Sequence, residues 1–93
     1  MKLIGYGEIP DNCIVVFTGK YCVACRQLEK RFATEADESL QKLVKYVQVE
    51  DYPHTAAMYG IMSLPTMLFV RNGIIKSNIV GNVPLSTIRN ELK

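Results

Sequence analysis

The order of hydrophobic and polar residues divides the chain into short segments of strand and helix character. The apolar run Cys13–Phe17 has β-branched residues on both faces, which predicts a buried strand in the centre of a sheet. Tyr46–Glu50 alternates with a period of two and predicts a second strand. Residues 2–6 predict a short, weaker strand, and the Pro, Asp and Asn among residues 7–12 predict a turn.

Helical spacing of apolar residues begins at Cys22 and ends around residues 34–37. The apolar face of this predicted helix consists of Cys25, Leu28 and Phe32. The opposite face, expected to lie in solvent, consists of Arg26, Glu29, Lys30 and Arg31. An apolar patch before the second strand consists of Leu40, Leu43 and Val44. Pro53 begins a short helix that Gly60 closes, and Pro84 begins a last helix.

Two further strands joined by a tight turn are the clearest local prediction. Thr66–Val70 and Ile74–Val80 flank Asn72-Gly73, and this dipeptide is the strongest short signal for a β-hairpin. The resulting order is β-α-β-α-β-β-α, with a parallel crossover first and an antiparallel hairpin last. The sequence therefore predicts an α/β fold with one mixed sheet and helices on both faces. No linker or repeat divides residues 1–93, which are expected to form a single domain.

Composition and charge argue against several classes of protein. Of the 93 residues, 48% are hydrophobic and 22% are charged, as in soluble globular proteins. The net charge of +2 is too small to indicate binding to nucleic acid or to an acidic membrane surface. No apolar run approaches the roughly 18 residues of a membrane-spanning helix, and residues 1–8 lack the apolar core of a signal peptide. Three cysteines leave one unpaired in any disulfide framework, so a reducing, cytoplasmic compartment is expected.

The segment Cys22-Val23-Ala24-Cys25 carries the candidate chemistry. Two cysteines three residues apart at the start of a helix place both sulfur atoms on one side of the first turn, close enough to form a disulfide. The free backbone N–H groups and the positive end of the helix dipole stabilise a thiolate on Cys22. This arrangement is that of a thiol–disulfide exchange site, although zinc sites use the same spacing.

From residue 13 to its end, the chain resembles the thioredoxin family. The matching features, in order, are the strand leading into Cys22–Cys25, Tyr59-Gly60-Ile61, Ser63-Leu64-Pro65-Thr66, the Asn72-Gly73 hairpin and Val80-Gly81. The resemblance implies a thioredoxin-like fold whose N-terminal arm is shortened by about one helix. It also implies the reduction of protein disulfides by dithiol exchange, with no cofactor beyond the cysteines.

The resemblance also implies a role for each matching residue. Cys22 matches the exposed nucleophile that forms a mixed disulfide with a substrate, and Cys25 matches the resolving cysteine. Pro65 matches the family's cis-proline, whose turn leaves the backbone of Leu64 free to pair with a bound peptide. The other positions expected to line the substrate groove are Tyr21, Ser63, Val80 and Gly81.

Two departures from the family pattern concern proton transfer. Val16 stands where the family usually has a buried aspartate, and Tyr46 stands where a lysine often accompanies it. The usual route for the proton of Cys25 is therefore missing. Val23-Ala24 supplies neither a rigid proline nor a charge between the cysteines, and the sequence leaves the direction of electron flow open.

Other candidate residues have simpler interpretations. Cys13, at the start of a buried strand, is expected to be an inert apolar thiol. His54 is expected to be a solvated residue in the first turn of a short helix. Lys20 could favour a thiolate on Cys22, but solvent would screen an exposed lysine. A metal site at the cysteine pair would need Cys13 and His54 as further ligands, so no metal is expected.

Three functions remain open from the sequence. The prediction we adopt is a monomeric reductase of protein disulfides that a flavin-dependent thioredoxin reductase recharges. The second is a glutaredoxin-like enzyme that uses glutathione, but Val80–Pro84 stands where glutaredoxins carry a Gly-Gly and acidic motif. The third is a thioredoxin-like subunit that binds a larger partner through the face of Tyr21, Leu64 and Gly81 and needs no dithiol chemistry.

Overall fold

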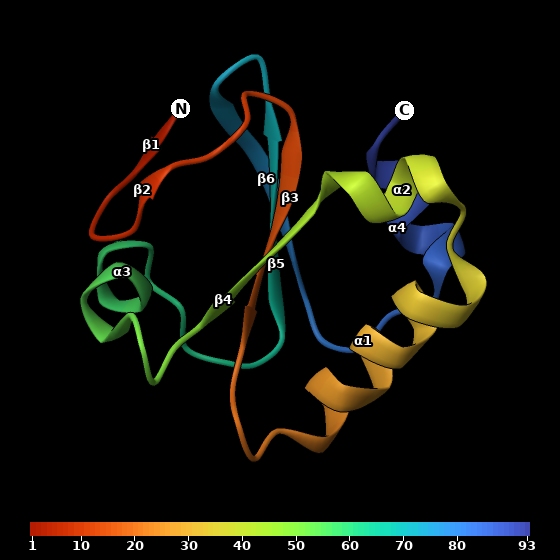
Figure 1. Ribbon diagram of the computed structural model, residues 1–93, viewed down its shortest axis with the longest axis horizontal. Helices are drawn as coiled ribbons and strands as arrows, with labels where there is room; N and C mark the ends of the chain where they lie inside the picture. The colour runs from red at the N-terminus through yellow and green to blue at the C-terminus, as the bar shows by residue number, and fades with distance from the viewer.

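Four strands form the main sheet, in the order β4-β3-β5-β6 (Figure 1). The structure is a computed structural model that describes all of residues 1–93. The strands are β3 (Cys13–Thr18), β4 (Val44–Gln48), β5 (Thr66–Arg71) and β6 (Ile74–Val80). β4 runs parallel to β3, whereas β5 runs antiparallel to both β3 and β6. The predicted mixed sheet is therefore confirmed, with β3 in its interior.

Four helices cover the two faces of this sheet. They are α1 (Val23–Glu35), α2 (Glu38–Leu43), α3 (Pro53–Met58) and α4 (Leu85–Glu91). α1, α2 and α4 lie on one side of the sheet and α3 lies on the other, so helices on both faces are also confirmed (Figure 1). None of the helices combines the length and the apolar character that crossing a membrane requires.

β3 is buried along its whole length and divides its side chains between two cores. Ile14 and Val16 pack in the core beneath α1, α2 and α4. Cys13, Val15 and Phe17 pack on the opposite face, together with residues from α3 and the N-terminal segment. The alternation is that of a strand with an apolar layer on each side, which is why this run contains no polar residue until Thr18.

α2 is a helix that the apolar spacing did not predict. The Asp37 carboxylate accepts a hydrogen bond from the Leu40 N–H at 2.8 Å and caps the helix, while the Leu40 side chain is buried. Glu38 and Lys42 form an ion pair at 3.3 Å one turn apart. A six-residue helix spans fewer than two turns, which is too short for apolar residues to repeat with helical spacing. The sequence therefore predicts only an apolar patch in this region.

Two predicted strands have different bounds in the structure. The predicted strand over residues 2–6 is shorter in the structure, because the chain turns back at Gly5 (φ +77°) and forms a small hairpin of β1 (Lys2–Leu3) and β2 (Gly7–Glu8). β4 begins two residues earlier than predicted, because its register is set by pairing with β3. Val44 lies opposite Ile14 at the start of that pairing.

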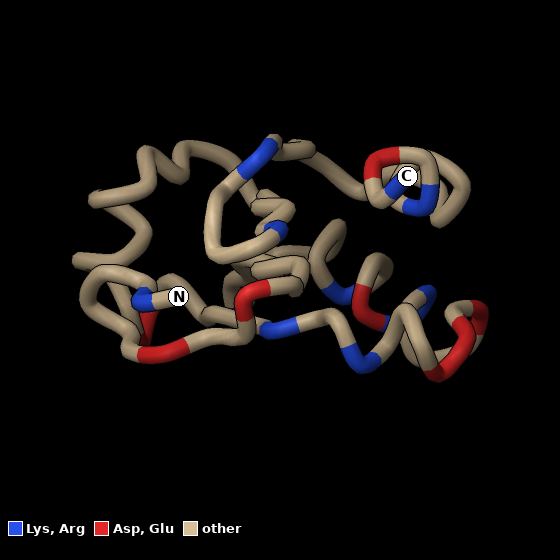
Figure 2. The backbone as a smooth tube through the Cα atoms, turned by 90° about the horizontal axis from the view of Figure 1, so that it is seen from above, with Lys and Arg blue, Asp and Glu red and all other residues tan.

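The predicted Asn72-Gly73 turn is confirmed. Both residues have positive φ angles, 53° for Asn72 and 74° for Gly73, as a two-residue hairpin turn requires. Figure 2 shows acidic and basic residues interspersed on the side of α1, α2 and α4, rather than gathered into a patch of one sign. This distribution agrees with the small net charge of +2.

Candidate active site

Cys22 and Cys25 form a disulfide at the beginning of α1, with their Cα atoms 5.2 Å apart. Cys22 is the N-cap of the helix, and its Sγ accepts a hydrogen bond from the Cys25 N–H at 3.1 Å. Cys22 is partly exposed, whereas Cys25 is only 1% exposed and faces the core. The sulfur atom of Cys22 is therefore open to a partner and lies at the helix terminus, whereas the sulfur atom of Cys25 is buried behind it.

A tight turn after β3 presents this pair. The Gly19 carbonyl accepts a hydrogen bond from the Cys22 N–H at 3.4 Å and closes the turn. A Cβ atom on Gly19 would lie 2.8 Å from Cδ1 of Leu64, inside the distance at which carbon atoms normally pack. Glycine at this position therefore allows the Leu64 side chain to lie directly against the turn that carries Cys22.

Residues from two other segments lie beside the turn. The Leu64-Pro65 peptide bond is cis, as the family resemblance implied. The Gly81 N–H donates a hydrogen bond to the Pro65 carbonyl at 2.8 Å, which joins the end of β6 to this loop. Gly81 has a φ of +103° and open space where a Cβ would point, so its backbone angle is the local reason for glycine.

The surface beside the disulfide is rich in exposed apolar side chains. Tyr21 is 94% exposed directly before Cys22, and Val23 and Val80 are also largely exposed. Met62, which the sequence analysis did not single out, is 93% exposed next to the solvent-facing Ser63. The residue type alone does not distinguish an exposed methionine from a core methionine. The exposure of Met62 follows from its place in the loop before Leu64, which only the structure shows.

The position of the family's buried acid is apolar in this chain. Val16 is 1% exposed and packs in the core beneath α1. Tyr46, its partner on β4, takes the neighbouring position. Burial, and then the negative charge of Glu29, raise the pKa of Tyr46 to about 12, while Arg26 acts in the opposite direction. Tyr46 thus remains a neutral phenol at physiological pH.

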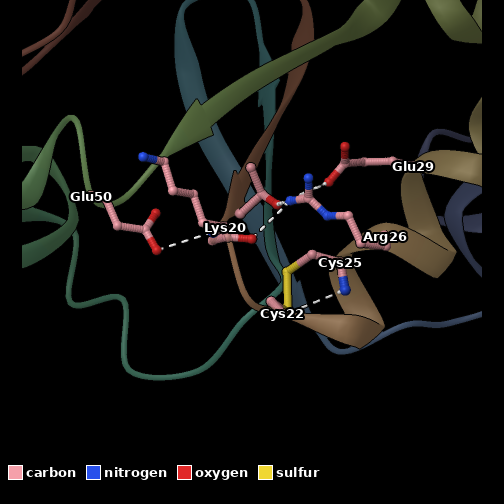
Figure 3. A network of polar contacts seen from close by, with 8 residues as sticks. Lys20, Cys22, Cys25, Arg26, Glu29 and Glu50 are labelled. Atoms are coloured by element: carbon pink, nitrogen blue, oxygen red, sulfur yellow. Dashed lines mark hydrogen bonds and ion pairs between the residues drawn. A yellow bond between two sulfur atoms is a disulfide. The ribbon is translucent and has the colours of Figure 1, made fainter.

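Polar groups appear one step further along β3, beside Thr18. Nη2 of Arg26 donates hydrogen bonds to Oγ1 of Thr18 at 3.0 Å and to the Gly19 carbonyl at 2.8 Å. Glu29 lies 2.9 Å from the same Arg26 nitrogen and accepts a hydrogen bond from Thr18 Oγ1 at 3.0 Å. Figure 3 shows both charged side chains turned from α1 toward the end of β3.

The predicted solvent-exposed charged face of α1 is therefore confirmed for Arg26 and Lys30, whereas Glu29 and Arg31 are partly buried. Arg26 and Glu29 pair over the end of β3, at the margin of the helix that faces the sheet. Arg31 is partly buried and donates to Oδ1 of Asn82 at 2.6 Å and to the Val83 carbonyl at 2.8 Å. Helical spacing identified the apolar face, but long side chains at its edges reach back to the sheet.

Lys20 and Glu50 complete the polar surroundings of the turn. The Lys20 N–H donates a hydrogen bond to Oε2 of Glu50 at 3.0 Å. The Lys20 side chain extends away from the disulfide, so its ammonium group does not approach the sulfur atoms (Figure 3). Lys20 thus contributes its backbone rather than its charge, and Glu50 is a second residue that the sequence analysis missed.

The remaining candidates lie away from the disulfide or lack partners for chemistry. Cys13 is 3% exposed, its thiol lies 3.4 Å from the Pro10 carbonyl, and burial raises its pKa. His54 is exposed at the start of α3, as predicted. No three His, Cys, Asp or Glu side chains lie together in an arrangement that could hold a metal ion.

Comparison with protein families and relatives agrees with this geometry. The family model described as Thioredoxin matches residues 8–93. A chloroplastic M-type thioredoxin from Pisum sativum is 33% identical over 81 residues, which cover 86% of this chain and 47% of that protein. A thioredoxin from Mycoplasma genitalium is 35% identical over 77 residues, covering 83% of this chain and 76% of the relative. The chain thus spans about half the length of the pea relative and about three quarters of the mycoplasma one.

Solved structures show the same fold. A thioredoxin from Malassezia sympodialis superposes with a TM-score of 0.72 at 24% identity, covering 88% of this chain and 72% of that chain. A thioredoxin from Fasciola hepatica gives a TM-score of 0.73 at 21% identity, covering 86% of this chain and 76% of the other. At these identities the likeness bears on the fold alone, whereas the match over residues 8–93 bears on the family.

Proposed function

The chain belongs to the thioredoxin family, and from this premise we propose that it reduces protein disulfides by dithiol exchange. The observation that carries the proposal is the Cys22–Cys25 disulfide at the start of α1, with one sulfur exposed and the other buried. A pair that closes within one helical turn can store and release two electrons without any rearrangement of the fold.

The reaction begins with the reduced pair. The Cys22 thiolate attacks one sulfur of a substrate disulfide, a Cys22–substrate bond forms, and the other substrate sulfur leaves as a thiolate that takes up a proton. Cys25 then loses its proton and attacks the Cys22 sulfur. The second substrate sulfur leaves as a thiolate, and the Cys22–Cys25 disulfide remains. Two electrons have passed from the protein to the substrate.

The surroundings of the pair suit an extended peptide as substrate. Tyr21 and Val80 offer exposed apolar surface, and the backbone of Leu64 lies at the loop that contacts the turn carrying Cys22. Main-chain pairing with Leu64 would hold a substrate strand, with Ser63, Pro65 and Gly81 lining the same groove. Such recognition depends on backbone groups and apolar contact, so it accepts many sequences around a cystine.

Cys25 must lose a proton in the second step, and no carboxylate occupies the position of Val16 beneath it. Water that reaches the opened site is the proton acceptor in this proposal. We expect resolution to depend on pH more steeply than it would with a nearby buried base, because the fraction of Cys25 thiolate then follows bulk pH.

The pair must be reduced again after each turnover. The proposed donor is a flavin-dependent thioredoxin reductase acting on a monomer of this chain in the cytoplasm. Either donor, that reductase or glutathione, would return two electrons through attack on the Cys22 sulfur, since Cys25 is shielded.

Reduction of insulin disulfides tests the proposal. One reaction contains NADPH and thioredoxin reductase, a second contains NADPH, glutathione and glutathione reductase, and a third contains dithiothreitol as the donor. We expect turnover in the first reaction and in the third. Turnover in the second alone would instead assign a glutaredoxin-like activity, and no turnover in any of them would overturn the proposal in favour of a binding subunit.

A further inference from the structure

One peptide unit in the active-site turn is held at both of its polar atoms by charged side chains. The Gly19 carbonyl and the Lys20 N–H belong to the same peptide bond. Arg26 donates to the carbonyl at 2.8 Å, and Glu50 accepts from the N–H at 3.0 Å. A cation at the oxygen and an anion at the nitrogen both align with the peptide dipole, so each contact strengthens the polarisation that the other favours.

The two charged residues reach this peptide from different elements. Arg26 belongs to the first turn of α1, and Glu50 follows β4 in the loop before α3. Figure 3 shows them on opposite sides of the turn, each joined to it by a dashed line. The structure gives no ion pair between them, so the Gly19–Lys20 peptide is the group that they share.

The Arg26 side chain is itself held in position. Thr18 Oγ1 and Glu29 both lie within 3.0 Å of its Nη2, and Thr18 is only 4% exposed. Glu29 and Thr18 are also hydrogen-bonded to each other. This arrangement restricts the guanidinium to the neighbourhood of Gly19, where a free arginine on a helix would sample many rotamers.

The Gly19–Lys20 peptide is hydrogen-bonded to the backbone of Cys22. The same Gly19 carbonyl accepts the Cys22 N–H at 3.4 Å, and Cys22 in turn is the N-cap whose Sγ accepts the Cys25 N–H at 3.1 Å. The orientation of the turn therefore decides whether the sulfur of Cys22 lies at the free N–H groups of the helix. The same N–H group retained beside a reduced Cys22 would form a charge-assisted hydrogen bond that favours the thiolate.

We propose that Arg26 and Glu50 form a clamp on the Gly19–Lys20 peptide that positions the Cys22 sulfur as a nucleophile. The inference deepens the proposed function, on which it rests, and adds two positioning residues to it. Neither residue touches the reacting sulfur atoms in the proposed mechanism. Both act through the backbone of the turn.

The clamp can be separated from a direct effect of charge by the sign of two substitutions. If only charge mattered, removing the positive charge of Arg26 would disfavour the Cys22 thiolate, and removing the negative charge of Glu50 would favour it. If the two residues act by positioning, loss of either one disfavours the thiolate. The substitutions Arg26→Met and Glu50→Met remove both the charge and the hydrogen-bonding atoms of each side chain. They therefore give the same sign under the clamp and opposite signs under charge alone.

The experiment measures alkylation of the reduced full chain by iodoacetamide between pH 5 and 9. Mass spectrometry follows labelling of Cys22, and the buried Cys13, which should stay unlabelled, reports that each variant remains folded. We expect both variants to move the midpoint of the Cys22 rate profile upward by about half a pH unit, which lowers the rate at pH 6 by about threefold. The matched controls are Lys30→Met and Asp51→Asn, which remove the same charges nearby from exposed side chains without hydrogen-bond partners.

Two further variants keep the test decisive. Arg26→Lys, which retains the charge and one donor, is expected to recover part of the shift, and it replaces Arg26→Met if that variant does not fold. The double variant is expected to shift the profile less than the sum of the single shifts, because both act on one peptide. Opposite shifts, or profiles identical to the parent protein, would overturn the clamp.

Alkylation requires no reductase and no protein substrate. A parent chain that fails to reduce insulin, together with shifted variant profiles, would therefore reject the proposed function and leave the positioning of Cys22 standing. A parent chain that reduces insulin, together with unshifted variant profiles, would support the proposed function and reject the clamp.

Discussion

The beginning of α1 and the beginning of β3 each bury a sulfur atom, and the two differ in what surrounds it. Cys25 is 1% exposed and Cys13 is 3% exposed. Cys25 lies at a helix N-terminus and is bonded to a second cysteine. Cys13 faces the Pro10 carbonyl at 3.4 Å, and burial raises its pKa although Lys45 opposes the shift.

This comparison teaches that two equally buried cysteines differ in their partner groups: Cys25 has a second cysteine and a helix N-terminus beside it, whereas Cys13 has neither. N–H donors at a helix terminus favour a thiolate, whereas a carbonyl oxygen favours the protonated thiol. In the proposed reaction, the exposed neighbour Cys22 gives Cys25 access to substrates that the buried Cys25 does not contact itself. Four predictions break or sharpen this contrast.

Loss of either active-site sulfur is expected to have the largest effect. Cys22→Ser and Cys25→Ser should each lower insulin reduction by on the order of a thousandfold or more, because each removes a bond-forming atom. Cys25→Ser should also accumulate a Cys22–substrate mixed disulfide, visible as a covalent adduct by mass spectrometry. Cys13→Ala is the matched control and should retain turnover within about twofold. A Cys25→Ser protein with normal dithiol turnover would contradict the resolving role.

The labelling rates of the two kinds of cysteine should differ by about a hundredfold. In the reduced protein at pH 8, iodoacetamide should modify Cys22 first, because Cys22 is both more exposed and closer to the helix N–H groups. Cys13 should become reactive only in denaturant. Peptide mapping against time would measure both rates, and comparable rates in the folded protein would show that the surroundings of Cys13 do not protect it.

Supplying the missing acid beneath Cys25 should produce a gain in rate and a loss in stability. Val16→Asp buries a carboxyl with no partner, which should lower the free energy of unfolding by about 1–3 kcal/mol or more. It should also raise the exchange rate several-fold near pH 7, because burial raises the pKa of the introduced carboxyl toward that of a useful base.

Val15→Asp is the matched control for this change. Val15 is equally buried on the same strand, but it faces the other core. It should lose comparable stability in urea denaturation and gain no exchange rate. An exchange rate of Val16→Asp that stays at the parent value from pH 6 to 9 would show that deprotonation of Cys25 is not limiting.

Alkaline pH should have the smallest effect on stability. The pKa values of Cys13 and Tyr46 are both raised in the folded protein, that of Tyr46 to about 12. A raised folded-state pKa contributes stability that is fully present below the unfolded-state value and is lost as the pH rises through the folded-state value. For the reduced protein, the free energy of unfolding should therefore decline above about pH 9 to 10. Cys13→Val and Tyr46→Phe should each flatten part of that decline, and a curve unchanged in both variants would contradict it.

Residues close together in the sequence were placed well by pattern alone. The run Cys13–Phe17, the Asn72-Gly73 turn and the helical spacing after Cys22 each reflect energies that a few neighbouring residues determine. The same reasoning gave too long a strand over residues 2–6. The residues around Gly5 favour a strand, but the positive φ of Gly5 allows the chain to turn there. The sequence does not predict α2, because this helix has one N-cap and one buried leucine but no apolar face that repeats over several turns.

Register and the polar contacts of the site required the tertiary structure. β4 begins at Val44 because Ile14 lies opposite, and Glu50 contacts Lys20 across thirty residues of sequence. From the sequence, Arg26 is expected to be a solvated helix residue. Its hydrogen bond to the Gly19 carbonyl is seen only when the end of β3 lies beside α1. Such contacts depend on which segments the folded chain brings together. The local preferences of a few neighbouring residues do not determine which distant segments meet.

By itself, the sequence determined the family, the order of the four main strands and of α1, α3 and α4, and the two cysteines that form the redox pair. These follow from apolar periodicity, turn chemistry and one four-residue motif, all of which act within a few residues. Only the tertiary structure decided how the Gly19–Lys20 peptide is held, and that the residue opposite Val16 on β4 is the phenol of Tyr46 rather than a charged group. The physical reason is that a side chain's partners are set by packing between distant segments, which becomes fixed only when the whole sheet has formed.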